Sequence, residues 1–518
     1  MIKIKRNIFI ILLTVIGSLI VLNCKPSIVR APDEVSSFPN IKITYIKLER
    51  QPVFTNLNYD DVEILAGKKL IKGTIHAEGY HTSSPVKMVV YIHGNVLITR
   101  NIRVNTKFQF ALQNNIPDNA SIRVKLFDRH GNVLSESGEY KQANWQVTNE
   151  IPKRIDTEQI GTALRRNLTN NGQFRVINAP NTGLSFMHEM HYNTTLQMEM
   201  HKTDVSESSS LTALGRSINP IKKFTTDLMI PTISTELVNW AAPQGSVIHN
   251  GILYVVYEDS RHKDFGRIVS FDLGKIRGVQ EFHNEKNILR ILEKKVNRKA
   301  YVQGDELRVI KSVKVSSFMN TGHGQAFSYN TQTHSLWLIS LMNNKKQMLT
   351  QINPSDFSVI KKSEFYFLDS VNNNRIHGER NLAIQKNGDI NMISVVNSAE
   401  TNDTNLKVGD VLLYHGRFSE GKLHLNLSRT VIRSKPGYYT QFLSMDNNSG
   451  RLFYLTDGAY LSIPAQKWAT NTLLYNDVNM GVYATEAGGT REFESQVWWK
   501  GRTFILTNRG AELMVGTK

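Results

Sequence analysis

A strand–turn–strand unit recurs five times in this 518-residue chain, beginning at residues 243, 324, 380, 440 and 493. Each copy holds a polar residue, a short apolar strand, a turn that begins six residues later, and a second strand of β-branched and aromatic residues. In three copies the turn contains a glycine, namely Gly251, Gly388 or Gly501, which is typical of tight β-hairpins. Repeats of this kind predict a β-propeller, because each unit buries its apolar strands against its neighbours.

The spacing of the copies sets the expected number of blades. Their polar residues lie 81, 56, 60 and 53 residues apart, a range that suits four-stranded blades with loops of variable length. The last copy ends one strand short, so a strand from residues 184–235 is expected to complete it and close the ring. The sequence therefore predicts a five-bladed propeller over residues 238–518, preceded by a connecting region, 141–237, that contributes strands to it.

Equivalent polar residues of the five copies are expected to meet at one mouth of the central channel, because the first strand of every blade lines that channel. These residues are amides in four copies and a carboxylate in the fifth, and further polar residues stand two positions earlier on the same strand face in four copies. The predicted ligand-binding residues of the channel mouth are Gln244, His323, Gln325, Glu379, Asn381, Tyr439, Gln441, Glu492 and Glu494.

Two interpretations of this mouth stay open on the sequence alone. It binds a sugar or a cation, or it is a polar lining bridged by water. Its three glutamates, Glu379, Glu492 and Glu494, together with amides, would suit Ca²⁺, and they could also act as acid and base in glycan cleavage. If the mouth faces water, Gln441→Ala and Glu494→Gln should change stability by no more than an exposed substitution does, about 0.5 kcal/mol.

The N-terminus predicts export. A basic segment with Lys3, Lys5 and Arg6 precedes an apolar stretch at residues 8–22, the pattern of a signal peptide or membrane anchor over residues 1–24. Positive charge stays on the cytoplasmic side, so the rest of the chain is expected at the extracellular face of the membrane. The single cysteine, Cys24, is a candidate for lipidation; an uncleaved anchor and a cleaved signal remain alternatives.

Between this anchor and the repeats, the pattern predicts a second β domain. Residues 25–40 form a Pro- and Ser-rich spacer. Residues 41–140 contain about seven or eight short strands separated by turns, which fits an immunoglobulin-like β-sandwich. No residue set in this sandwich suggests catalysis. The fold class predicted for the whole chain is therefore mainly β.

The charge of the chain predicts anionic partners. Lys and Arg number 62 against 45 Asp and Glu, a net charge of +17, which attracts polyanions. In an exported protein the expected partner is an anionic cell-envelope polymer or a glycan, besides the membrane, and no nucleic acid. A predicted helix within Glu281–Lys299 carries five of the cations, either as a contact for an anionic surface or as a solvated face: Lys286, Arg290, Lys294, Lys295 and Arg298.

Sequence motifs of common enzyme classes are absent from the chain. It contains no Gly-x-Ser-x-Gly elbow, phosphate-binding P-loop, Gly-x-Gly-x-x-Gly fingerprint or His-Glu-x-x-His helix. The sequence leaves the question of an enzyme open and favours a binding protein.

Three segments of the repeats resemble the helveticin J-like proteins, which are large class III bacteriocins of lactic-acid bacteria. They are Gln441-Phe442-Leu443-Ser444-Met445-Asp446-Asn447-Asn448, Glu492-Phe493-Glu494-Ser495-Gln496 and Gly322-His323-Gly324-Gln325. The resemblance covers roughly residues 238–518 and implies a secreted antibacterial or envelope-binding protein. The expected function is therefore a cell-surface β-propeller that binds an envelope component, with or without a bacteriocin-like activity. The alternative is an envelope glycan hydrolase that uses the carboxylates of the channel mouth.

Overall fold

The computed structural model divides the chain into two compact units, Met1–Pro52 and Val53–Lys518. It describes residues 57–59, 61–77, 85–148, 158–166, 174–178, 210–215, 221–231, 233, 241–259, 262, 264–278, 285–341, 347–369, 375–376, 381–396, 405–419, 422–433, 435–437, 440–456, 459–485, 492–508 and 511–516. The predicted anchor with Cys24, the spacer, Glu379 and Tyr439 lie outside these residues. Among the described residues, no helix has the length and apolar character needed to cross a membrane.

The first described domain consists of short antiparallel strands around one apolar core. In β8, Ile122, Val124 and Leu126 are fully buried and alternate with more exposed residues, as a half-buried strand requires. The core joins a three-stranded and a four-stranded sheet, and the immunoglobulin-like topology stays a prediction. Its strands are β1 (Leu57–Asn58), β2 (Glu63–Ile64), β3 (Leu70–Gly73), β4 (His76–Ala77), β5 (Val86–Ile92), β6 (Asn95–Ile102), β7 (Phe108–Ala111), β8 (Ile122–Phe127) and β9 (Val133–Glu136).

The repeats form antiparallel sheets in chain order, as their strand–turn–strand pattern predicts. The first sheet runs inside to outside through β16, β17, β18 and β20, the second through β22, β23, β24 and β25, and the third through β27, β28, β29 and β31. Their bounds are β16 (Ala241–His249), β17 (Ile252–Asp259), β18 (Phe265–Asp272), β20 (Val313–Val315), β22 (Phe327–Asn330), β23 (Ser335–Leu341), β24 (Gln347–Ile352), β25 (Val359–Asp369), β27 (Ala383–Ile384), β28 (Asp389–Val395), β29 (Val411–Ser419) and β31 (Thr430–Arg433).

The last two copies lie at the two ends of a nine-stranded sheet. One end is β32, β33, β34 and β35, and the other is β36, β37 and β38, which is followed by β15. Strand β15, which precedes the first repeat, thus pairs with β38, the last described strand of the chain. The bounds are β15 (Ile221–Met229), β32 (Thr440–Asp446), β33 (Arg451–Thr456), β34 (Ala459–Pro464), β35 (Asn479–Thr485), β36 (Glu492–Trp499), β37 (Arg502–Asn508) and β38 (Glu512–Gly516).

Residues 141–237 also supply an outermost strand to each of the first three repeat sheets, in chain order, and a strand that joins the last two copies. β11 (Gln146–Val147), β12 (Glu158–Arg166) and β13 (Arg175–Asn178) run parallel to β20, β25 and β31, respectively. β14 (Ser210–Gly215) is antiparallel to both β35 and β15. The connecting region therefore forms an outer belt, which the sequence pattern indicated only for the strand that completes the last unit.

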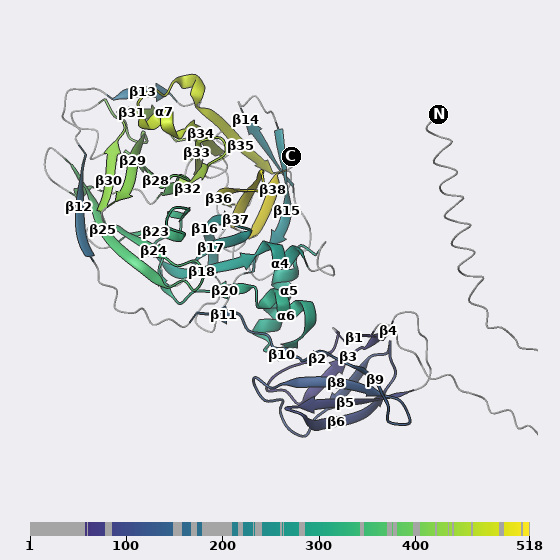
Figure 1. Cartoon of the computed structure of the whole chain (residues 1–518). Coiled ribbons are helices and arrows are strands. Elements are labelled where there is room, and N and C mark those ends of the chain that lie inside the picture. The colour runs from purple at the N-terminus through teal and green to yellow at the C-terminus, as the bar shows by residue number, and fades with distance from the viewer. Residues whose placement is uncertain are drawn as a thin grey trace, which may run out of the picture. The chain divides into compact units, whose positions relative to one another are not determined.

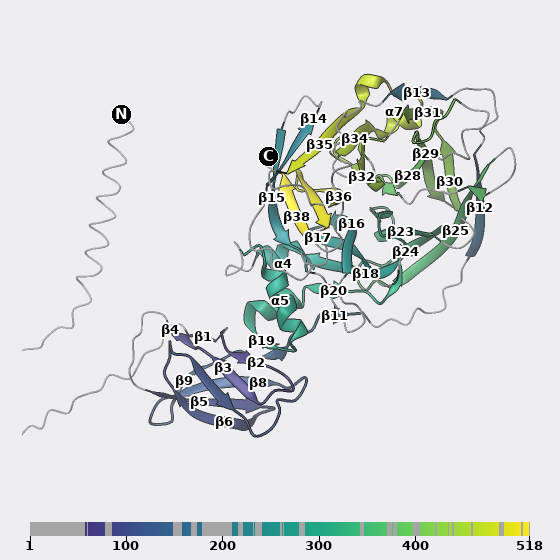
Figure 2. The same cartoon turned by 180° about the vertical axis from the view of Figure 1, so that it is seen from behind.

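The innermost strands contact one another in a closed series. β16 contacts β22, β22 contacts β27, β27 contacts β32, β32 contacts β36, and β36 contacts β16. Figures 1 and 2 show the sheets of the repeats arranged radially, with β16, β32 and β36 toward the axis. The second strands pack between neighbouring sheets, where Val256, Leu338 and Leu455 share one buried cluster. The repeat region is therefore a β-propeller whose core lies between its blades.

The predicted basic helix forms as α5 (Ile288–Asn297), with a different role for one of its cations. Arg290 is only 5% exposed, and its Nε donates to the carbonyl oxygen of Ile230 at 3.0 Å. Lys295 pairs with Glu306, whereas Lys294 is exposed. The expectation of a solvated face or of a contact with an anionic surface is wrong for Arg290, because the backbone carbonyls of Ile230 and Ala511 accept from its guanidinium.

The remaining elements are short connections and edge strands. They are α4 (Leu273–Arg277), α6 (Gly304–Ile310), α7 (Ala465–Ala469), the 3₁₀ helix η4 (Tyr475–Asp477), β10 (Lys141–Gln142), β19 (Tyr301–Val302), β21 (Met319–Asn320), β26 (Arg375–Ile376) and β30 (Lys422–Leu427).

Candidate functional site

The polar residue that begins the repeat lies at a local irregularity of the inner strand in three of the five repeats. In β16, β32 and β36 the pairing with the second strand slips by one residue at this position. The residues concerned are Gln244, Gln441 and Glu494. A β-bulge gives one residue no partner opposite and changes the direction of its side chain. Equivalent positions of different repeats therefore share an unusual backbone, which periodicity alone does not indicate.

Four of the five polar residues are buried rather than in contact with water. Gln244 is 4%, Asn381 1%, Gln441 2% and Glu494 0% exposed, and Gln325 is half-buried. The expectation of a water-exposed mouth is wrong for these four residues. The inner strands pack too closely for an open mouth at this level, since a Cβ placed on Gly245 would lie 2.3 Å from the carbonyl oxygen of Gly324.

Three of the predicted residues do meet across different repeats. Nε2 of Gln325 donates to Oε1 of Gln441 at 2.5 Å, and Nε2 of Gln441 donates to Oε1 of Glu492 at 3.2 Å. His323 does not join this network, because its Nδ1 pairs with Oε2 of Glu258 at 3.0 Å. The structure therefore shows an inter-repeat hydrogen-bond network where the sequence predicted a ligand-binding ring.

The predicted cation site cannot be assembled from the described residues. Within them, no group of three or more His, Cys, Asp or Glu side chains is placed to hold a metal ion. The Ca²⁺ hypothesis relied on three glutamates, of which Glu379 lies outside the described part of the chain. It therefore stays a prediction.

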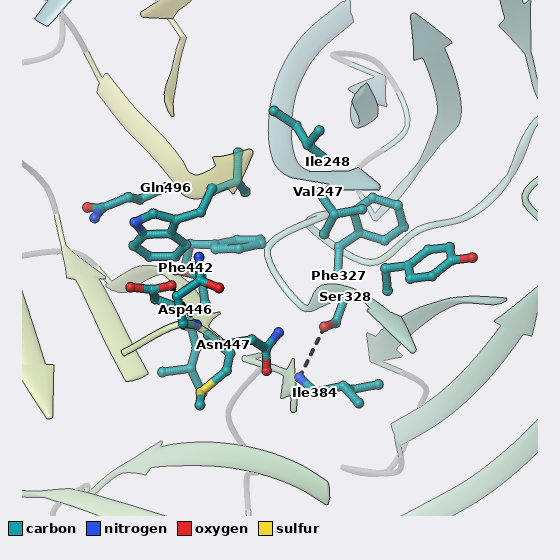
Figure 3. Close-up of a pocket in the computed structure, with 16 residues that line it drawn as sticks. Val247, Ile248, Phe327, Ser328, Ile384, Phe442, Asp446, Asn447 and Gln496 are labelled. Carbon is teal, nitrogen blue, oxygen red and sulfur yellow. Dashed lines mark hydrogen bonds between the residues drawn. The ribbon is translucent and has the colours of Figure 1, made fainter. Parts of the chain in front are cut away.

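A cavity lies further along the same inner strands, toward the hairpins that connect them to the second strands. Its volume is about 250 Å³. Figure 3 shows side chains from several inner strands around it. The residue three positions after the predicted polar residue lines the cavity in every repeat: Val247, Ser328, Ile384, Ser444 and Val497. Equivalent repeat positions thus converge as expected, but three residues beyond the ring that the sequence suggested.

Aromatic side chains form part of the cavity wall. Tyr329 and Trp498, which are half-buried, follow directly after two of the converging positions. The Tyr329 ring stacks on His249 with ring centroids 3.8 Å apart, and Trp498 packs at 4.6 Å against Phe453. Burial raises the pKa of Tyr329 and lowers the pKa of His249, so both rings are uncharged at neutral pH.

The hairpin between β32 and β33 adds polar groups to the wall, including Asp446, Asn447 and Asn448. Oδ1 of Asp446 accepts from the backbone N–H of Asn448 at 3.0 Å. Oδ1 of Asn447 accepts from the backbone N–H of Lys386 at 2.8 Å, which ties this hairpin to the preceding repeat. These contacts fix the loop, so its remaining hydrogen-bonding groups are held in place before a ligand arrives.

The two serines at the converging positions differ in whether their hydroxyl groups have a hydrogen-bond partner. Oγ of Ser328 accepts from the backbone N–H of Ile384 at 3.1 Å, as the dashed line in Figure 3 marks. Oγ of Ser444 is buried and has no hydrogen-bond partner among the described residues. A buried hydroxyl without a partner is costly unless water or a ligand supplies one. The Ser444 hydroxyl therefore lacks a partner beside the cavity, which water or a polar ligand would supply.

The comparisons with known proteins do not identify the chain. No protein-family model and no curated protein matches it. Among solved structures, it is similar to a protein of unknown function from Bacteroides thetaiotaomicron (8% identity, covering 90% of this chain and 98% of that one, TM-score 0.26). It is also similar to a catalytically inactive virginiamycin B lyase from Staphylococcus aureus with quinupristin (8%, 61% and 97%, TM-score 0.28).

A third similar structure is the β-propeller domain of the Trilobed protease from Pyrococcus furiosus (10% identity, covering 59% of this chain and 91% of that one, TM-score 0.23). TM-scores this low support no conclusion about the present chain. Its propeller fold rests instead on the strand pairings and on the closed series of inner strands.

Proposed function

We propose that this protein is an exported, cell-surface β-propeller of five blades that binds an uncharged glycan of the cell envelope without cleaving it. The observation that carries the proposal is the convergence of one position from all five repeats on a single cavity with aromatic walls. Sugar rings present apolar C–H faces and a rim of hydroxyl groups. The cavity offers Tyr329 and Trp498 to the first and the Ser444 hydroxyl to the second.

The closed series of inner strands supports the count of five blades. Each of β16, β22, β27, β32 and β36 begins one repeat and contacts the inner strands of two others. The preceding two-sheet domain is proposed to be immunoglobulin-like, because antiparallel sheets of three and four strands enclose one core.

The charge of the cavity favours an uncharged ligand over an anionic polymer. Asp446 is the one Asp, Glu, Lys or Arg side chain of its described lining, and a carboxylate opposes the binding of a second anion. The net charge of +17 lies elsewhere on the protein. It therefore supports a long-range attraction to the anionic envelope rather than recognition within the cavity.

The same lining favours binding over glycan cleavage. Glycoside hydrolysis by the common mechanisms uses two carboxyl groups on either side of the scissile bond. The described lining of the cavity contains one carboxylate, Asp446. Of the predicted glutamates, Glu494 is fully buried and Glu492 accepts a hydrogen bond from Gln441. The arrangement therefore supports a binding protein.

Titration calorimetry of the full chain with uncharged tetrasaccharides of glucose and of N-acetylglucosamine tests this proposal. Trp498→Ala should weaken binding at least tenfold, because it removes one wall of the cavity. Ser444→Ala should weaken it several-fold, because the ligand then loses a hydrogen-bond donor. The neighbouring Trp499 lies outside the described lining, so Trp499→Ala is the matched control and should bind as the wild type does. Binding that survives Trp498→Ala unchanged would contradict the assignment.

The proposed location rests on the sequence of residues 1–24. Protease added to intact cells should digest the chain beyond residue 40, and palmitate labelling that is lost in Cys24→Ser would establish lipidation. Recovery of the full chain from the cytosol would contradict export. The resemblance to the helveticin J-like proteins adds antibacterial activity to the proposal, and growth inhibition by the purified protein tests it.

A further inference from the structure

Two exposed phenylalanines from separate segments form one aromatic face on the first sheet of the propeller. Phe265 begins β18 and is 39% exposed, and Phe318 lies just before β21 and is 42% exposed. Their rings are nearly parallel, with centroids 5.8 Å apart and planes at 23°. The ring of His262 stands edge-on to Phe318 at 5.8 Å. We call these three side chains the aromatic platform.

The platform lies at the opposite end of the sheet from the cavity. Phe265 precedes Gly266, which pairs with Glu258, and Glu258 pairs with Ala242 near the beginning of β16. The cavity begins at Val247, toward the other end of the same strand. The platform is therefore a separate surface, and a ligand bound there does not occupy the cavity.

The backbone around Phe265 is held rigidly. The preceding residue, Asp264, adopts a left-handed conformation with φ of 67°. Its N–H donates to Oε1 of Glu258 at 3.3 Å, and its carbonyl oxygen accepts from the N–H of Thr321 at 3.0 Å. Glu258 also pairs with His323. These contacts fix the Phe265 ring in an exposed position without a ligand, which lowers the entropy cost of binding.

The segment that carries Phe318 is anchored in a similar way. The N–H of Ser316 donates to the carbonyl oxygen of Ile268 at 2.8 Å, and the N–H of Ile268 donates to Oγ of Ser316 at 2.8 Å. Nη1 of Arg267 donates to the carbonyl oxygen of Ser316 at 2.7 Å. Two fixed segments therefore present the two rings together. Large apolar side chains that adjoin and are exposed are uncommon on a surface without a partner, so this pair indicates a binding surface.

Polar groups border the platform. Nδ1 of His262 lies 3.0 Å from Oδ2 of Asp259, and the guanidinium carbon of Arg267 lies 6.0 Å from the centre of the Phe318 ring. An aromatic face bordered by hydrogen-bonding groups matches a sugar ring, whose C–H groups contact the π face while its hydroxyls reach the border. A cationic ligand fits less well, because Arg267 already places a positive charge beside Phe318.

We propose that the aromatic platform is a second binding site for an uncharged sugar, so that one propeller holds glycan at both ends. Phe265 and Phe318 provide the stacking surface, and His262 and Arg267 provide hydrogen bonds to hydroxyl groups. This inference takes the ligand class from the proposed function but does not depend on the cavity. Its consequence is that the protein can bridge two glycan segments rather than hold only one.

Binding stoichiometry of the full chain tests the platform separately from the cavity. With the uncharged tetrasaccharides of glucose and N-acetylglucosamine, wild-type protein should bind two molecules per chain. The double variant Phe265→Ala/Phe318→Ala should bind one, Trp498→Ala should bind one, and the triple variant should bind none. Leu474→Ala/Tyr475→Ala, which removes another pair of exposed side chains (55% and 42% exposed), is the matched control and should bind two.

The outcomes distinguish this inference from the proposed function. If the double phenylalanine variant binds as the wild type does, the platform is not a site, whatever the cavity does. If Trp498→Ala changes nothing while the double variant loses a site, the cavity assignment fails and the platform stands. Tetramethylammonium that binds the platform where the sugars do not would overturn the sugar assignment. Unchanged far-ultraviolet circular dichroism and a cooperative urea transition would show that each variant is folded.

Discussion

The Gln441→Ala variant distinguishes a buried hydrogen-bond network from a solvated channel mouth. The Gln441 amide is 2% exposed; it accepts a hydrogen bond from Gln325 and donates one to the Glu492 carboxylate. The first bond contributes about 1 kcal/mol, and the second, to a charged group, about 1.5–3 kcal/mol. We therefore expect Gln441→Ala to lower the free energy of unfolding by about 3 kcal/mol, many times the effect of an exposed substitution.

Urea denaturation followed by tryptophan fluorescence measures this change. Gln332→Ala is the matched control, because Gln332 also donates a side-chain hydrogen bond, to the carbonyl oxygen of Lys386, but is exposed. The control should change the free energy of unfolding by no more than about 0.5 kcal/mol. If Gln441→Ala has an equally small effect, the residue faces water and the burial argument is refuted.

Three further predictions concern the closure of the ring, helix α5 and pH. Thr226 donates to the buried carboxylate of Glu512 in β38 at 2.6 Å. Thr226→Val should therefore lower the free energy of unfolding, measured by urea denaturation, by about 1.5–3 kcal/mol, whereas Thr225→Val, at the half-buried neighbouring position, should change it little. Arg290→Ala removes a buried donor from backbone carbonyls and should cost about 3 kcal/mol; Lys294→Ala, on the exposed side of α5, should leave the unfolding midpoint unchanged. Burial lowers the pKa of His249 in the folded state, so its contribution to stability is complete above about pH 6.5 and is lost as the pH falls through the folded-state pKa. The urea midpoint of His249→Phe should therefore decrease less than that of the wild type between pH 7.5 and pH 5.5, and equal decreases would contradict this.

The strands of the repeats could be predicted from the sequence because the apolar residues of each strand stand close together in the sequence. The repeat pattern predicts a second strand after each turn, and β17 and β33 form at these places in the first and fourth copies. The convergence of equivalent repeat positions also follows from repetition alone. The bulges at Gln244, Gln441 and Glu494 could not be predicted, because a bulge depends on how two strands pair. They help to bury these three side chains.

The belt and the buried arginine depend on contacts between residues far apart in the sequence. β11 has two residues and β13 has four, too few for a periodic pattern to distinguish them from a loop. Their partners, β20 and β31, lie far along the chain. Arg290 stands in a helix whose other cations are more exposed, and the carbonyl oxygens of Ile230 and Ala511, which accept from its guanidinium, help to explain its burial.

The cavity could not be predicted from the polar pattern of the repeats, because those polar residues lie at the beginning of each inner strand. Three residues later the repeats carry two serines and three aliphatic residues, a mixed set that resembles ordinary strand packing. The available signal was the aromatic residue that follows in two copies, Tyr329 and Trp498, although an aromatic residue in a strand more commonly indicates a core.

A crystal structure of the full chain soaked with an uncharged tetrasaccharide tests the central claim most directly. The account predicts a sugar ring in the cavity between Tyr329 and Trp498, with a hydroxyl within hydrogen-bond distance of Oγ of Ser444. A sugar bound instead at the Gln325–Gln441–Glu492 network, or bound to the propeller with the cavity left to water, would contradict it.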